Sequence, residues 1–134
     1  MKSNIFLKDC LSELTEIIND YSKTGFIVSS EIVSDFRTEK IGFIKGKIVF
    51  SDESVLFFRE YLDLRCYIDK KAYSFHYQDR NTKLLFRYDN ALHKPALGFN
   101  EHKHTAEDRI IQTSVPDMGD ILEEIAREYL SREC

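Results

Sequence analysis

Apolar residues recur every three or four positions between residues 4 and 22. This spacing places them on one face of an α-helix, so the pattern predicts a helix over 4–22. Ser3 suits a helix start, and Gly25 follows the predicted end, as helix-stopping glycines do. The predicted apolar face consists of Leu7, Cys10, Leu11, Leu14, Ile17, Ile18 and Tyr21.

From Phe26 to about Asn90 the apolar positions alternate with polar ones, and β-branched and aromatic residues dominate. Alternation with a period of two is typical of β-strands, and short polar breaks ("RTEK", "SDES", "LRC", "DRNT") separate the segments. Such short connections join antiparallel neighbours, because a parallel crossover needs a dozen or more residues. The pattern therefore predicts a β-meander of five strands, at residues 26–36, 41–50, 54–64, 67–78 and 83–90.

Residues 91–116 lack a clear period, apart from a short strand predicted at "RIIQTSV" (109–115). A loop of this length is unusual inside a compact domain and is often functional. A final helix is predicted over 118–132, with Asp117 as its cap. The predicted fold class is α+β: an antiparallel meander of about five strands flanked by an N-terminal and a C-terminal helix, in a single domain (1–134). Glu123 and Glu124 fall on the predicted polar side of the last helix.

The fourth and fifth strands predict how polar residues gather on one face of the sheet. If "DRNT" is the turn and Gln78 pairs with Lys83, then His76 pairs with Leu85, Ser74 with Arg87 and Ala72 with Asp89. One face is then almost wholly aromatic, and the other carries the polar side chains. In this register His76 and Arg87 are diagonal neighbours, within reach of long side chains.

Charge and composition limit the classes of protein. The chain carries a net charge of −4, but residues 65–104 hold eight basic and four acidic side chains, a local charge of +4. A positive segment in an acidic protein hints at an anionic ligand. Three scattered cysteines predict no disulfide framework, no apolar run could cross a membrane, and the N-terminus does not resemble a signal peptide. These features predict a cytoplasmic protein.

All four histidines fall in the positive segment, three of them in or after the irregular loop. Metal-independent RNA cleavage needs a base, an acid and a cation, which histidine and arginine side chains can supply. The competing interpretation is a surface ion pair with solvated histidines. The candidate catalytic residues are His76, Arg87, Asp89, His93, His102 and His104.

The sequence "HKH" places His102 and His104 on one side of an extended segment, as two metal ligands would lie. Asp89 or His93 could complete such a site. The spacing does not match a cupin, which needs a glutamate four or five residues past the second histidine. We predict no cofactor, and a divalent metal ion at His102 and His104 remains the alternative.

The C-terminal half also resembles a known family. "YSFHYQDRNTKLLFRYDNALHKP", followed by "HKH" and a short acidic helix after a proline, is similar to the TumE family of small bacterial and archaeal proteins. The family pattern joins an aromatic strand ending in Gln-Asp to an "RYDNA" strand, histidines with proline, and "HKH". Leu92 and Lys94 depart from it, where the family often has proline and histidine. The matching positions are Tyr73, Phe75, Tyr77, Gln78, Asp79, Arg87, Tyr88, Asp89, Asn90, Ala91, His93, Pro95, His102 and His104.

This resemblance implies a toxin of a two-gene toxin–antitoxin system, with a small antitoxin as partner, but it implies no mechanism. The leading hypothesis is a ribonuclease in which Arg87 and Lys103 hold phosphate, His102 and His104 act as base and acid, and Asp89 orients a histidine. The alternatives are a non-enzymatic module that docks an acidic partner or nucleic acid, and a metal-dependent hydrolase. An exposed edge strand of the meander further suggests either homodimerisation or pairing with a strand of the antitoxin. The candidate substrate-binding residues are Gln78, Lys83, Asn90 and Lys103.

Overall fold

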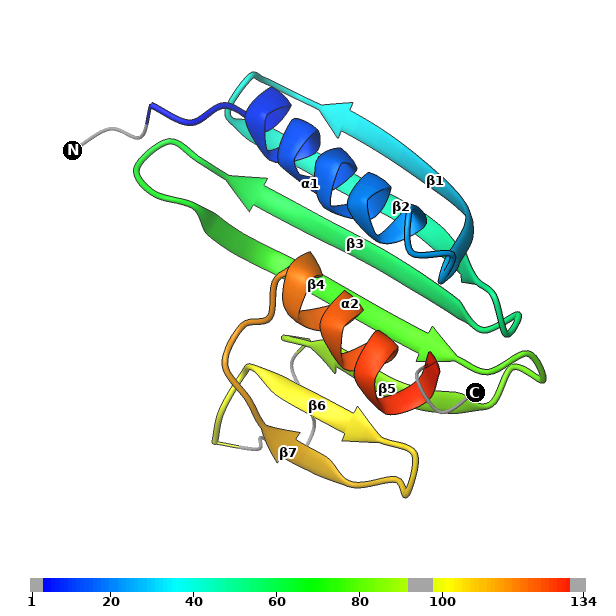
Figure 1. Cartoon of the computed structure of the whole chain (residues 1–134). Coiled ribbons are helices and arrows are strands. Elements are labelled where there is room, and N and C mark those ends of the chain that lie inside the picture. The colour runs from blue at the N-terminus through cyan, green and yellow to red at the C-terminus, as the bar shows by residue number, and fades with distance from the viewer. Residues whose placement is uncertain (1–3, 92–97, 131–134) are drawn as a thin grey trace.

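The computed structural model describes residues 4–91 and 98–130. Helix α1 comes first, seven strands follow, and helix α2 continues into a short π-helical segment, η1 (Figure 1). Within the described residues, no helix combines the length and the apolar character needed to cross a membrane. The elements are α1 (Leu7–Ser22), β1 (Ile27–Phe36), β2 (Ile41–Phe50), β3 (Val55–Asp63), β4 (Asp69–Gln78), β5 (Leu84–Asp89), β6 (His102–Thr105), β7 (Ile110–Gln112), α2 (Met118–Ile125) and η1 (Ala126–Leu130).

The strands form one antiparallel sheet in the order β1-β2-β3-β4-β5-β6-β7, and both helices lie on the same face of it (Figure 1). The predicted α+β meander with a helix before and after is confirmed. The predicted strand number is wrong, because the sheet has seven strands rather than five. Strand β7 lies within the short strand predicted at 109–115, whereas β6 was not predicted, since four residues are too few to reveal a period.

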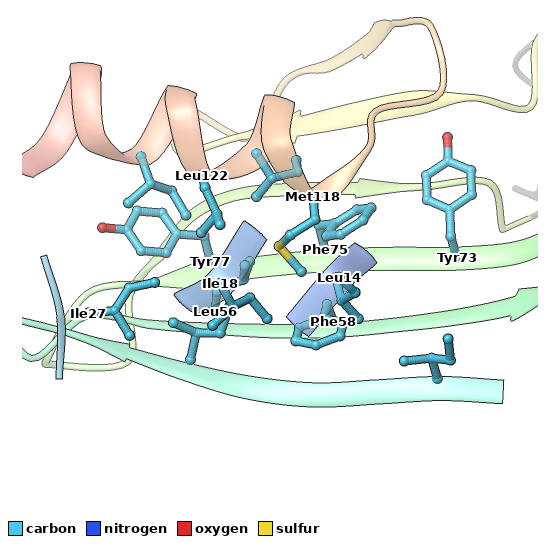
Figure 2. Close-up of a cluster of buried hydrophobic side chains, with 14 of the residues drawn as sticks. Leu14, Ile18, Ile27, Leu56, Phe58, Tyr73, Phe75, Tyr77, Met118 and Leu122 are labelled. Atoms are coloured by element: carbon cyan, nitrogen blue, oxygen red, sulfur yellow. The ribbon is translucent and has the colours of Figure 1, made fainter. Parts of the chain in front are cut away.

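The hydrophobic core fills the space between the two helices and one face of the sheet. Figure 2 shows Met118 and Leu122 of α2 facing the aromatic side chains of β4. Phe75 and Tyr77 of that strand are fully buried, as is Phe86 of β5. Burying one such side chain contributes about 1.5–3 kcal/mol, so these three together contribute about 4.5–9 kcal/mol to folding. The aromatic face predicted for β4 and β5 is therefore the core face.

The helix ends agree only partly with the sequence prediction. Helix α1 begins at Leu7, three residues later than predicted, and the Phe6 backbone N–H donates to the Asp9 carboxylate at 2.9 Å. Gly25 follows the helix with φ of 85°, a conformation that favours glycine. The predicted Asp117 cap is confirmed, since its side chain accepts a hydrogen bond from the Asp120 N–H at 2.8 Å. The predicted Ser3 cap and residues 131–132 of the last helix lie outside the described residues.

The predicted pairing of β4 with β5 is wrong by two residues. His76 lies opposite Arg87 and Ser74 opposite Asp89. One residue of the shift comes from the turn, where Asp79 pairs with Lys83 and Thr82 adopts φ of 66°. The other comes from a bulge next to Gln78. Because the total shift is even, every side chain keeps its predicted face, and His76 and Arg87 become direct rather than diagonal neighbours.

Candidate functional site

The face of the sheet that carries neither α1 nor α2 is called the open face below. Side chains that pair directly across antiparallel strands share a face. On the open face Asp89 of β5 pairs with His102 of β6, and Arg87 pairs with His104. With His76 of β4 opposite Arg87, three strands bring five polar side chains together. We call these five residues the Asp89 cluster.

Asp89 lies at the centre of this cluster, although its side chain is only 5% exposed. One carboxylate oxygen accepts from Nε of Arg87 at 2.7 Å. The other lies 2.7 Å from Nε2 of His102 and accepts from the Ala91 backbone N–H at 3.1 Å. A buried carboxylate is stable only when charges and donors surround it, and these contacts meet that need.

Arg87 is held on two sides. Its Nε donates to Asp89, and its Nη1 lies 3.3 Å from Nδ1 of His76. Since arginine can only donate, Nδ1 of His76 accepts, and the proton of the neutral ring is on Nε2, which lies 3.2 Å from Oε1 of Gln78. Burial, together with the charge of Arg87, lowers the pKa of His76. His76 is therefore a neutral residue that orients Arg87, whose guanidinium stays partly exposed.

The two histidines of β6 differ in accessibility. The His102 side chain is fully buried, whereas that of His104 is 23% exposed. Nδ1 of His102 lies 2.6 Å from the Asn100 carbonyl oxygen and therefore donates to it. Nε2 of His102 then faces both Asp89 and Nε2 of His104, the latter at 3.1 Å. His104 is thus the histidine of β6 that a ligand can reach.

The same geometry satisfies the requirements of a metal centre. One ligand atom each from Asp89, His102 and His104 lies within 4.8 Å of the other two. Ligands ~2.0–2.2 Å from one tetrahedral ion lie ~3.3–3.6 Å apart, and the separations in this cluster, from 2.7 to 3.8 Å, bracket that range. The bond from His102 to a backbone carbonyl is also the usual outer contact of a metal-bound histidine. Two imidazoles and one carboxylate suit a divalent transition metal ion.

A groove of about 370 Å³ leads to the cluster along the open face. Phe43 and Arg59 line it from β2 and β3, and Arg87 and Asp89 line it from β5. The cluster is thus reached from solvent through a channel with aromatic and cationic walls.

Comparison with known proteins decides the family. The family model described as toxin TumE matches residues 14–132. The chain belongs to the TumE toxin family. The match covers most of the chain, including the N-terminal strands, so the resemblance seen in the C-terminal half is confirmed and extended. Neither the curated proteins nor the solved structures gave a significant match.

All four predicted substrate-binding residues lie outside the cluster or at its border. Lys103 of β6 points to the helix-covered face, where its Nζ donates to Glu124 of α2 at 3.0 Å. Lys83 lies in the exposed turn before β5. The Asn90 side chain bonds the β4 backbone at Tyr73 and Lys71. Gln78 contacts only the outer side of His76 within the cluster. The predicted catalytic residue His93 lies outside the described residues.

The sequence analysis missed two residues that support the site, Asn100 and Glu124. The carbonyl of Asn100, which orients His102, belongs to the backbone, so no residue type signals it. Glu124 was placed on a solvated helix side, but it accepts from Tyr88 at 2.6 Å and from Lys103. Its signal is the Lys103–Glu124 charge pair, which is visible only once the helix is known to lie over β5 and β6. Glu124 thus fixes α2 to the strands that carry the cluster.

Proposed function

We propose that this TumE family toxin acts by cleaving RNA at the Asp89 cluster. The observation that carries the proposal is the meeting of a partly exposed arginine and an accessible histidine around one buried carboxylate. Cleavage of an RNA phosphodiester by the 2′-hydroxyl of the adjacent ribose requires a proton acceptor for that hydroxyl and a cation for the phosphate. His104 and Arg87 are such a pair. Membership of a toxin family also implies an antitoxin that would bind this protein.

In this mechanism Arg87 binds the scissile phosphate and offsets the charge that develops on it. The His104 ring takes the proton of the 2′-hydroxyl, and the 2′ oxygen attacks phosphorus. The bond from phosphorus to the 5′ oxygen breaks, and that oxygen takes a proton from water. His102 is too deeply buried to touch the substrate, so we assign it and Asp89 the role of positioning residues for His104 and Arg87.

The convergence of Asp89, His102 and His104 favours a second candidate, a metal-dependent hydrolase. Here the three side chains would hold a divalent cation that activates water. The two candidates differ in their products. Attack by the 2′-hydroxyl leaves a 2′,3′-cyclic phosphate, whereas attack by metal-activated water leaves a free hydroxyl and a terminal phosphate.

Induced expression in a bacterial host tests the role of the cluster. We expect growth arrest with the wild type and none with Arg87→Ala or His104→Ala. Arg65→Ala is the matched control, because Arg65 also binds an aspartate, at 2.9 Å from Asp63, but lies outside the cluster. Arrest by all variants would contradict the proposed site. Each variant is purified and checked by circular dichroism, so that loss of folding is not mistaken for loss of activity.

The purified protein is then incubated with single-stranded RNA. A cyclic phosphate product that persists in a chelator supports the first candidate. Activity lost in the chelator and restored by a stoichiometric metal supports the second. Tight binding of RNA without any cleavage would make the protein a binding module instead and would overturn both.

A further inference from the structure

The open face extends well beyond the Asp89 cluster, and its composition changes across β2, β3 and β4. We infer that this part of the open face is a binding surface for single-stranded RNA, with Phe57 as a base-stacking platform and Lys45, Lys47 and Arg59 as phosphate contacts. The inference rests on the proposed function in that it names the substrate class and the path along which the substrate reaches the cluster.

Direct strand pairing places the relevant side chains in continuous rows across the sheet. Lys47 of β2 pairs with Phe57 of β3, which pairs with His76 of β4, which pairs with Arg87. With strands ~4.8 Å apart, the row from β2 to β5 is about 14 Å long. A row of this length accommodates a short extended segment of nucleic acid that ends at the cluster.

Phe57 is the exposed aromatic residue of this row. Its side chain is 41% exposed although it lies in the middle of the sheet, between β2 and β4. Its ring lies 6.4 Å from the His76 ring, centroid to centroid, and Nζ of Lys47 lies 5.9 Å from its centroid. An aromatic ring flanked by a cation is the arrangement on which single-stranded bases stack.

A parallel row supplies cationic side chains and a second aromatic pair. Lys45 pairs with Arg59, which pairs with Ser74, which pairs with Asp89. Arg59 lies 5.7 Å from the ring centroid of Phe43. The Phe43 and Tyr61 rings in turn lie 4.6 Å apart. Arg59 and Phe43 form the outer wall of the groove that reaches Arg87, so this row also leads to the cluster.

The charges on this surface are complementary to a phosphate backbone. Lys45, Lys47 and Arg59 are exposed, and within the described part of the chain none of them forms an ion pair. The acidic side chains of the neighbouring strand β1, Glu31 and Asp35, lie opposite Lys47 and Phe43, at the edge of the sheet. A nucleic-acid chain, which is anionic, is therefore expected to bind over β2–β5 rather than over β1. A single strand fits better than a duplex, because only unpaired bases offer their faces to Phe57.

Fluorescence anisotropy with a labelled 2′-O-methyl RNA oligonucleotide measures binding without cleavage through the 2′-hydroxyl. We expect Phe57→Ala to weaken binding between about five-fold and about a hundred-fold, with the slope of log Kd against log salt unchanged. Lys45→Gln and Lys47→Gln should each reduce that slope by about 0.7, because each removes one phosphate contact. The same oligonucleotide annealed into a duplex should bind more weakly.

Controls on the helix-covered side of the molecule match both kinds of variant. Phe36→Ala removes an aromatic side chain that is 37% exposed on β1, and Lys23→Gln removes a cation at the end of α1. Both should bind like the wild type. Equal weakening by Phe36→Ala and Phe57→Ala, or duplex binding as tight as single-strand binding, would overturn the inference.

The assay separates this inference from the proposed function. If the wild type binds RNA in a way that depends on Phe57 but cleaves none, the RNA-binding surface is supported and the proposed ribonuclease function is refuted. If Phe57→Ala and Lys47→Gln leave the cleavage rate at sub-saturating RNA unchanged, the ribonuclease function is supported and the RNA-binding surface is refuted.

Discussion

Replacing Asp89 by asparagine tests whether the cluster is held together by charge. Asparagine keeps the shape of the side chain, but it removes the negative charge and turns one acceptor into a donor. Nε of Arg87 donates to one carboxylate oxygen at 2.7 Å and the Ala91 backbone N–H donates to the other at 3.1 Å, so the new amide group would face one of these donors. We therefore expect Asp89→Asn to lower the free energy of unfolding and to abolish growth arrest.

The magnitude follows from the contacts that are lost. A hydrogen bond to a charged group contributes about 1.5–3 kcal/mol, and Asp89 accepts one from Arg87 Nε and one from the Ala91 backbone N–H. The one to Arg87 is discounted, because the Arg87 side chain is 38% exposed to solvent. The expected loss is about 2–4 kcal/mol. For a chain of this length, each kcal/mol lowers Tm by ~3–4 °C.

Urea unfolding followed by circular dichroism measures this loss. Asp20→Asn is the control, since Asp20 is 65% exposed and its one ion pair among the described residues is with Lys23, three positions along the chain. It should unfold like the wild type. The m-value should stay constant, which shows that the denatured state is unchanged. An Asp89→Asn variant as stable as the wild type would refute the claim that these contacts stabilise the cluster.

Two further predictions concern the core side of the sheet. Gly46→Ala should cost about 1–3 kcal/mol in urea unfolding, because its Cβ would collide with the backbone carbonyl oxygen of Glu31 and lie 2.6 Å from the Phe58 ring. Gly119→Ala in α2 should change the unfolding free energy by less than about 1 kcal/mol, because its Cβ would meet only Oδ1 of Asp117, at 3.3 Å. Equal effects would contradict the packing argument. Burial raises the pKa of Glu60 despite the nearby ammonium of Lys70, so the folded state disfavours the ionised carboxylate. Wild-type stability relative to Glu60→Gln should therefore fall as pH rises above 4.5, and a pH-independent difference in unfolding free energy would refute this.

Much of the fold could be predicted because alternation and short turns are local signals. The bounds of β2, Ile41–Phe50, agree with the predicted strand, since polar breaks lie on both sides of it. The register between β4 and β5 could not be predicted. It depends on a positive φ at Thr82 and on a bulge next to Gln78, and neither threonine nor glutamine is typical of such a conformation. Strand β6 is short and gains its pairing from β5, so only the folded sheet defines it.

The face on which the polar residues of β4 and β5 lie was predicted correctly although the register was not, because alternate residues of one strand point to the same side of the sheet. A shift of two residues changed the partner of Arg87 but not its face. The same alternation puts both histidines of "HKH" on one face and Lys103 between them on the other, and the pairing of β5 with β6 brings those histidines to the face of Arg87 and Asp89. The sequence alone therefore shows that Lys103 points away from the two histidines, and the pairing of β6 with β5 shows that it points to the core side.

Alternation does not predict burial, and burial is what separates the roles of His102 and His104. Both lie on the open face, but His102 pairs with the central carboxylate and bonds the Asn100 carbonyl, while His104 pairs with the partly exposed Arg87. A fully buried ring cannot exchange a proton with a substrate directly, whereas it can hold a carboxylate or a cation in place. Replacing His102 should therefore change cleavage indirectly, by shifting Asp89, whereas replacing His104 should remove a direct contact with the substrate. If the two replacements gave the same pH profile of cleavage and the same RNA affinity, this division of roles between two neighbouring histidines would be wrong.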